Sequence, residues 1–253
     1  MPALLSLIRL PNLLIIAFAQ YMIRLCLLEP ILLLAGYKLQ MSDFYFFLLV
    51  ISTVLVAAGG YIINDYFDVR IDGINKPKHL IIDKGIKRRI AMGLHAAVSF
   101  LGVGIGIFVS YKSNILFSGG AIFSLTVIGL WFYSTTFKYQ LLIGNIIISL
   151  FTAMIPLLVV LYEIPLMVTK YNNQLFKEMS EMGTSTRDTI LLWVGAFALA
   201  SFVFSVIREI IKDMEDYEGD KEYGCYTVPV VFGIKKTKKI VSLLIVLTIA
   251  GIG

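Results

Sequence analysis

The sequence predicts an all-α, polytopic membrane protein, and three observations lead to this fold class. Hydrophobic residues make up 58% of the chain, charged residues make up 15%, and the mean hydropathy is +0.84, whereas soluble domains are about 25% charged. Apolar runs of about 20 residues recur, and a helix of this length crosses a ~30 Å hydrocarbon core. The runs lack the alternation of barrel strands, so we expect the spanning structures to be helices.

Seven apolar runs are expected to form the spans of a helical bundle. In chain order they cover Leu13–Gly36, Phe44–Ile63, Ile90–Tyr111, Ile115–Tyr133, Leu141–Tyr162, Thr189–Ile207 and Ile240 to the end. The first six are each long enough to cross the hydrocarbon core as a helix. The seventh has 14 residues, about 21 Å at a rise of ~1.5 Å per residue. We therefore expect the sequence to be a truncated form of a longer protein.

Basic residues predict how the spans are oriented. The segment 64–89, after the second run, and the segment 208–239, after the sixth, each contain seven Lys and Arg residues, while the alternate loops contain few. By the positive-inside rule both segments face the cytoplasm. We expect an integral protein of the cytoplasmic membrane, if the source is bacterial or archaeal. Topology and anionic lipid account for the net charge of +5, so no nucleic-acid partner is expected.

These two segments carry the most informative motif, an acidic triplet that occurs twice with the spacing D-x-x-D-x-x-x-D. Its members are Asp65, Asp68 and Asp72 and then, 148 residues later, Asp213, Asp216 and Asp220. Steps of three and four residues predict that the carboxylates of each copy lie on one side of a helix. Carboxylates at a membrane boundary cost free energy unless a cation uses them. Two such clusters suit Mg²⁺ shared with substrate phosphates; the alternative is solvated helix ends paired with lysines.

Polar and basic residues near the acids are candidates for binding a diphosphate, whose charge Mg²⁺ alone does not cancel. Lys138, nearly alone in the short loop after the fourth run, is the first candidate, and Lys212 and Arg208 follow. Asn64 precedes the first triplet, either as a ligand of metal or phosphate or as a hydrogen-bonding group at a helix end. Arg9, at the start of the first run, either joins the site or anchors the chain at lipid headgroups.

The organisation predicted is one membrane-embedded domain over residues 1–253, built of two pseudo-repeated halves at about 1–140 and 141–253. In each half, an even number of spans leads to an acidic helix end and then to a basic stretch with Gly and Pro, which predicts a turn. The external segment 163–188 departs from this plan. It contains the apolar face of a predicted short interfacial helix, formed by Leu175, Phe176, Met179 and Met182.

Several segments together resemble the UbiA superfamily of membrane prenyltransferases. They are the NDxxDxxxD motif from Asn64, the second acidic motif, RLPN at 9–12, DGINKP at 72–77, YSTTFK at 133–138 and GDKEYGCYTVPVVFG at 219–233. The resemblance covers nearly the whole chain. It implies nine helices around a lipid-open cavity that two acidic segments cap on the cytoplasmic side, with about seven of the nine spans present here.

The resemblance also implies a reaction and a set of site residues. The Mg²⁺ ligands would be Asp65, Asp68, Asp72, Asp216 and Asp220, and Asp213 would complete the catalytic acids. Near the diphosphate would lie Asn64, Tyr133, Lys138 and Lys212. Departure of the diphosphate would leave an allylic cation for an acceptor to attack. Many relatives follow the first motif with an NRP stretch, where this chain has NKPKHLIIDKG with Lys76, Lys78 and His79. Which of these basic residues contacts the second phosphate stays open, and Lys76 is taken as the candidate.

The acceptor is the least determined part of this prediction. RLPN, INKP and KDMEDYEGD are most similar to members that transfer geranylgeranyl to geranylgeranylglyceryl phosphate, and aromatic quinone precursors are the alternative acceptors. A cation- or proton-coupled transporter is an alternative of another class, but it would place its acids near the midplane of the membrane. An inactive membrane scaffold is a third. The expected partners are a prenyl diphosphate, a lipid-soluble acceptor and membrane lipids, and nothing in the sequence indicates the oligomeric state.

Overall fold

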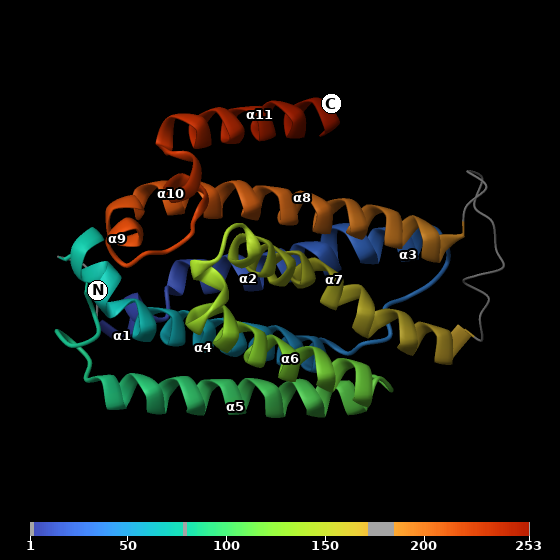
Figure 1. Cartoon of the computed structure of the whole chain (residues 1–253). Coiled ribbons are helices and arrows are strands. Elements are labelled where there is room, and N and C mark those ends of the chain that lie inside the picture. Colours follow the sequence, from blue (N-terminus) through green and yellow to red (C-terminus); the bar gives the residue numbers. More distant parts are fainter. Residues whose placement is uncertain (1–2, 78–79, 172–184, 253) are drawn as a thin grey trace.

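The computed structural model describes residues 3–77, 80–171 and 185–252. In this part of the chain long helices run side by side as a bundle (Figure 1). Six helical stretches of the described residues are long and apolar enough to cross a membrane, which confirms the predicted fold class. They are α2 (Leu10–Met22) continued through a π-helical turn (Ile23–Leu28) into α3 (Glu29–Leu34), α4 (Asp43–Asn75), α5 (Arg88–Lys112), α6 (Leu116–Thr135), α7 (Ile143–Tyr171) and α8 (Thr186–Glu215).

The seventh predicted span is where the structure differs from the sequence prediction. The run from Ile240 belongs to α11 (Ile234–Ile252), and this helix does not qualify as a span on its described residues. Its first two turns carry Lys235, Lys236, Lys238 and Lys239, and ammonium groups need water or lipid headgroups rather than hydrocarbon. The described part of the chain therefore has six candidate spans instead of seven. α11 packs against α8 at the margin of the bundle (Figure 1).

α4 is the helix that carries the first acidic triplet, and its length places those acids. Its 33 residues extend about 50 Å at ~1.5 Å per residue, well beyond a ~30 Å hydrocarbon core. The helix continues without a break from the apolar run through the triplet. α4 packs closely along α5 because glycines face the contact: a Cβ at Gly102 would lie 3.1 Å from the backbone nitrogen of Val56.

The second acidic triplet does not lie on one helix, contrary to the prediction. Asp213 is on α8, Asp216 is the residue at which α8 ends, and Asp220 is on the short α9 (Tyr217–Glu222). The backbone between α8 and α9 is hydrogen-bonded to Asn75 of α4. The N–H of Gly219 donates to Asn75 Oδ1 at 2.8 Å, and Asn75 Nδ2 donates to the backbone oxygen of Asp216 at 3.0 Å. Helices α9 and α4 are thereby joined beside the acids.

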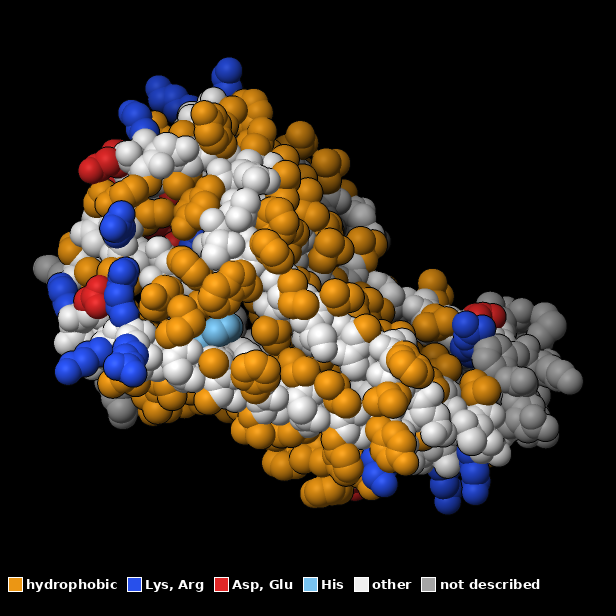
Figure 2. Space-filling view, turned by 60° about the horizontal axis from the view of Figure 1, so that its bottom comes forward, with side chains coloured by type: hydrophobic (Ala, Val, Ile, Leu, Met, Phe, Trp, Pro, Cys, Tyr) orange, Lys and Arg blue, Asp and Glu red, His pale blue; other side chains and the backbone are white. Residues whose placement is uncertain are grey.

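The surface of the bundle is that of an integral membrane protein. Large apolar side chains are widely exposed, as at Leu34 and Phe117, each 90% exposed. In Figure 2 hydrophobic side chains cover the broad middle of the molecule, while Lys and Arg side chains gather toward its two ends. A water-soluble monomer rarely exposes such a continuous apolar surface, whereas lipid covers it without cost.

The end of the bundle opposite the acids is held by polar contacts between spans. Arg24, in the π-helical turn, is 4% exposed, donates to the backbone oxygen of Met41 at 2.7 Å and pairs with Asp43 at 2.9 Å. Glu163 of α7 accepts a hydrogen bond from the backbone N–H of Met41. The loop between the first two spans is thus fixed on both sides. The interfacial face predicted at residues 175–182 lies outside the described residues.

Candidate active site

The six acids of the two triplets line one polar chamber of about 230 Å³ at the end of the bundle. Three short elements close this chamber around the ends of α4 and α8: the segment at Arg9 before α2, the 3-10 turn Phe137–Tyr139 after α6, and α9. Its charged and amide lining residues are Arg9, Asn64, Asp65, Asp68, Asp72, Lys76, Lys138, Asn145, Glu209, Lys212, Asp213, Asp216 and Asp220. The predicted meeting of the two triplets is therefore found in the structure.

The acids of α4 are held by cations that reach in from outside the helix. Arg9 pairs with Asp65 at 2.7 Å, and Arg9 adopts a left-handed backbone conformation, with φ of 52°, just before α2 begins. Lys138 forms an ion pair with Asp68, and Asn64 Nδ2 donates to the other oxygen of Asp68 at 2.8 Å. The side chains of Asp68 and Lys138 are 13% and 9% exposed, so this pair is almost completely desolvated.

The acids of α8 and α9 have different partners. Asn145 of α7 donates to Asp213 at 2.8 Å, Lys76 lies 2.7 Å from Asp216, and Thr227 donates to Asp220 at 3.1 Å. Burial raises the pKa of the Asp220 carboxyl to about 6, and the hydrogen bond from Thr227 opposes that rise. The second group of acids is thus held mainly by neutral hydrogen-bond donors.

Two lysines of the chamber differ in how they are engaged. Burial lowers the pKa of the Lys138 ammonium, while the carboxylate of Asp68 acts in the opposite direction. Lys212 lines the chamber but forms no ion pair with any residue that the structure describes. The ammonium of Lys212 is therefore a cation that a bound anion can reach without displacing a carboxylate.

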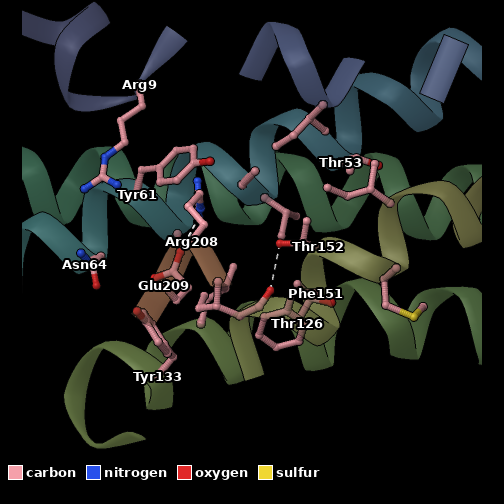
Figure 3. A pocket seen from close by; sticks show the side chains of 18 of the residues that line it. Arg9, Thr53, Tyr61, Asn64, Thr126, Tyr133, Phe151, Thr152, Arg208 and Glu209 are labelled. Atoms are coloured by element: carbon pink, nitrogen blue, oxygen red, sulfur yellow. Dashed lines mark hydrogen bonds and ion pairs between the residues drawn. The ribbon is translucent and has the colours of Figure 1, made fainter. Parts of the chain in front are cut away.

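A second, largely apolar chamber of about 340 Å³ adjoins the first, with which it shares lining residues, and runs between the spans. Figure 3 shows its wall: Arg9, Asn64 and Tyr133 lie toward one side, and Thr53, Phe151 and Thr152 lie farther along the spans. Thr126 and Thr152 donate to backbone oxygens of their own helices, at 2.7 Å and 3.0 Å. Both hydroxyls are thereby satisfied. Both chambers are lined by Arg9, Asn64, Tyr133, Glu209 and Lys212.

Residues 27–253 match the family model described as the UbiA prenyltransferase family. The chain belongs to this family. The resemblance drawn from the acidic motifs is therefore confirmed.

Relatives within the UbiA family are digeranylgeranylglyceryl phosphate synthases of archaea. The one from Pyrococcus horikoshii is 34% identical over 192 residues, which cover 76% of this chain and 58% of the relative. The one from Sulfurisphaera tokodaii is 31% identical over 202 residues, which cover 80% and 63%. The chain thus spans about three fifths of the length of these relatives.

A solved structure is also similar to this UbiA-family chain. It is described as "Structural and mechanistic insights into the biosynthesis of Digeranylgeranylglyceryl phosphate synthase in membranes". The match covers 98% of this chain and 74% of that one, at 25% identity and a TM-score of 0.61. The helical fold is therefore shared over nearly the whole length of this chain.

The UbiA family implies a divalent cation, and the polar chamber offers a fitting set of ligands. Carboxylate and amide oxygens are the donors that Mg²⁺ prefers, and Mg²⁺ usually takes one or two carboxylates together with substrate phosphates. Among the described residues no three His, Cys, Asp or Glu side chains converge closely enough to hold an ion by themselves. The side-chain oxygen of Asn64 is buried and accepts no hydrogen bond from a described residue. Such an oxygen suits a cation or a water bound to it.

The structure places twelve of the thirteen predicted site residues in the polar chamber of this UbiA-family chain. The exception is Arg208, which lines the apolar chamber and pairs with Glu209. Sequence reasoning missed Glu209, Asn145 and Asn75. Glu209 had a detectable signal, because it precedes Asp213 by four residues and so lies on the same side of α8. Asn145 had none, since it lies in an apolar run 68 residues from its partner.

Proposed function

We propose that the chain is a Mg²⁺-dependent intramembrane prenyltransferase that moves a geranylgeranyl group from geranylgeranyl diphosphate to geranylgeranylglyceryl phosphate. The observation that carries this proposal is the pair of joined chambers, one acidic and basic and the other apolar. A prenyl diphosphate has the same two parts. The relatives from Pyrococcus horikoshii and Sulfurisphaera tokodaii are named for digeranylgeranylglyceryl phosphate, the product of this transfer.

The polar chamber binds the diphosphate in this proposal. Mg²⁺ would neutralise phosphate charge and stabilise the departing diphosphate, held by Asp65, Asp68, Asp72, Asp216 and Asp220, with Asp213 beside them. Cations and hydrogen-bond donors of the chain would take the remaining phosphate oxygens; they are Lys212, Lys138, Lys76, Arg9, Asn64 and Tyr133. Among the cations of this set, Lys212 has no ion pair with a described residue to exchange.

The apolar chamber receives the hydrocarbon chain and excludes water from the allylic cation. Tyr61, Phe151 and Tyr133 line it, and an aromatic face attracts a cation by about 0.5–2 kcal/mol. The chamber thus offers the cation ring faces within a largely apolar lining.

In this proposal the chamber of acids faces the cytoplasm, since Lys and Arg residues surround it in the sequence. The two pseudo-repeated halves, about 1–140 and 141–253, each contribute one acidic triplet. The acids lie where α4 and α8 end rather than midway along them. This position favours chemistry on a charged group that enters from water over transport of an ion across the membrane.

The experiment is a transfer assay in liposomes with radiolabelled geranylgeranyl diphosphate, with and without Mg²⁺. The acceptors are geranylgeranylglyceryl phosphate and a panel of aromatic acids. We expect Mg²⁺-dependent transfer to the glyceryl phosphate, abolished by Asp68→Asn or Asp216→Asn and retained by Asp83→Asn, which changes an exposed acid outside the chamber. Transfer to an aromatic acid and not to the glyceryl phosphate refutes the proposed identity of the acceptor. Full transfer by the Asp68→Asn and Asp216→Asn proteins refutes the site.

A further inference from the structure

Glu209 is an acid outside both triplets, and it lies where the two chambers meet. Its side chain is 6% exposed and lines both chambers, whereas the triplet acids line the polar chamber. In Figure 3 Glu209 lies beside Arg208, on the side of the pocket where Asn64 and Tyr133 lie. A buried carboxylate at this position is not explained by Mg²⁺ binding, which the triplets supply.

In the proposed function, the reacting carbon of the prenyl diphosphate would lie at the joint between the chambers, where the two share lining residues. If the diphosphate lies among the acids and the hydrocarbon among the apolar side chains, the first carbon of the prenyl chain lies beside the residues that line both chambers. Five residues line both chambers: Arg9, Asn64, Tyr133, Lys212 and Glu209. Among these five, Glu209 is the residue with a carboxylate, a group that acts as a general base in enzymes.

The ion pair with Arg208 does not account for a buried Glu209 by itself. The Arg208 side chain is 61% exposed, so most of its surface is uncovered and it does not itself require a buried counter-ion. Glu209 is the desolvated partner, and burying an unpaired carboxylate is costly. The pair therefore supplies a counter-charge to the Glu209 carboxylate and fixes its orientation. Three further groups interact electrostatically with Glu209: Lys212, Asp213 and Tyr133.

We propose that Glu209, oriented by Arg208, accepts the proton of the acceptor's hydroxyl group; this inference rests on the proposed function. The bond between the first prenyl carbon and the diphosphate oxygen breaks, and the diphosphate leaves with the bonding electron pair. The acceptor oxygen forms an ether bond to that carbon. The hydroxyl proton passes to a carboxylate oxygen of Glu209. The acceptor class is thus an aliphatic alcohol, which is too weakly acidic to ionise by itself.

The test compares an alcohol acceptor with a thiol acceptor in liposomes that contain the whole chain. The alcohol is geranylgeranylglyceryl phosphate, and the thiol analogue carries S–H in place of the reacting O–H. A thiol ionises at pH ~8.5 and needs no base from the protein there. We expect Glu209→Gln to lower transfer to the alcohol at least ~100-fold, the usual contribution of a general base. Transfer to the thiol and the Kd for geranylgeranyl diphosphate stay within about threefold, or ~0.7 kcal/mol.

If Glu209→Gln lowers the rate of transfer to both acceptors equally, Glu209 has a structural role and the proposal is overturned. A rate of transfer to the alcohol within about threefold of that of the unchanged protein also overturns it. Glu222→Gln is the matched control, because Glu222 is an exposed acid of α9. If the Gln protein does not bind geranylgeranyl diphosphate, Glu209→Asp replaces it, and the alcohol rate must still fall more than the thiol rate. An unchanged protein that transfers to neither acceptor refutes the proposed function instead.

Discussion

Replacing Lys138 by Met tests whether this lysine binds the diphosphate or only neutralises Asp68. In the structure Lys138 pairs with Asp68, and both side chains are nearly buried. In the proposed complex the Asp68 carboxylate would hold Mg²⁺, and the ammonium of Lys138 would then be free to bind a phosphate oxygen. The Met side chain has a similar length and no charge, so it removes that contact while it preserves most of the packing.

The expected magnitude follows from the burial of the pair. A hydrogen bond to a charged group contributes about 1.5–3 kcal/mol, and the 9% exposure of Lys138 places this contact toward the upper end, where water screens little. At ~1.4 kcal/mol per factor of ten, the Kd for geranylgeranyl diphosphate should rise about 10- to 150-fold. Lys87→Met, which removes an exposed lysine, should leave the Kd unchanged.

The assay is equilibrium binding of radiolabelled geranylgeranyl diphosphate to liposomes in Mg²⁺, on a double-mutant cycle with Asp68→Asn. If Lys138 binds the diphosphate, Lys138→Met weakens binding in the Asp68→Asn protein as well. If the lysine serves only as a counter-ion, its removal has no effect once Asp68 is neutral. That second result refutes the assigned contact.

Three further predictions concern the frame of the site. Asn75→Ala removes two hydrogen bonds to α9, about 1–3 kcal/mol in all, and should lower both the apparent Tm in detergent and the affinity for geranylgeranyl diphosphate; an unchanged affinity contradicts the link between α4 and the second triplet. Gly102→Val overpacks the contact with α4, which costs about 1–3 kcal/mol of stability; it should lower the apparent Tm and leave the Kd unchanged. Gly104→Val has open space around it and should leave both the apparent Tm and the Kd unchanged. The pKa of Asp220 in the folded protein, about 6, exceeds its ordinary value of 3.8, so ionisation of this carboxyl destabilises the fold as pH rises through this interval. Without Mg²⁺, the apparent Tm of Asp220→Asn minus that of the unchanged protein should therefore increase from pH 4 to 6 and stay constant above pH 6. A Tm difference that does not change with pH contradicts the assignment.

Much of the fold and site could be predicted because local patterns determine them. Apolar length identifies six of the spans, since few residues inside lipid can be charged. The spacing of Asp65, Asp68 and Asp72 predicts their common side of α4, because helical periodicity is set by the chain itself. The isolation of Lys138 in a short loop was also enough to single it out, and the structure pairs it with Asp68.

The second triplet could not be predicted because its geometry depends on a distant residue. In a continuous helix the N–H of Gly219 would bond to the oxygen of residue 215, but it bonds to Asn75, 144 residues away. A Cβ at position 219 would lie 2.6 Å from Asn75 Nδ2, so the close approach requires glycine. Identical spacing in the two triplets therefore gives one straight helix and one broken one.

The joint between the chambers would also determine where the two products of the proposed transfer go. Diphosphate would leave at the polar end, beside segments whose Lys and Arg residues predict a position facing water. The proposed ether product, with two long hydrocarbon chains, would leave the apolar chamber into the bilayer. Because the two products would enter different phases, the reverse reaction would need both of them to return to the joint at the same time.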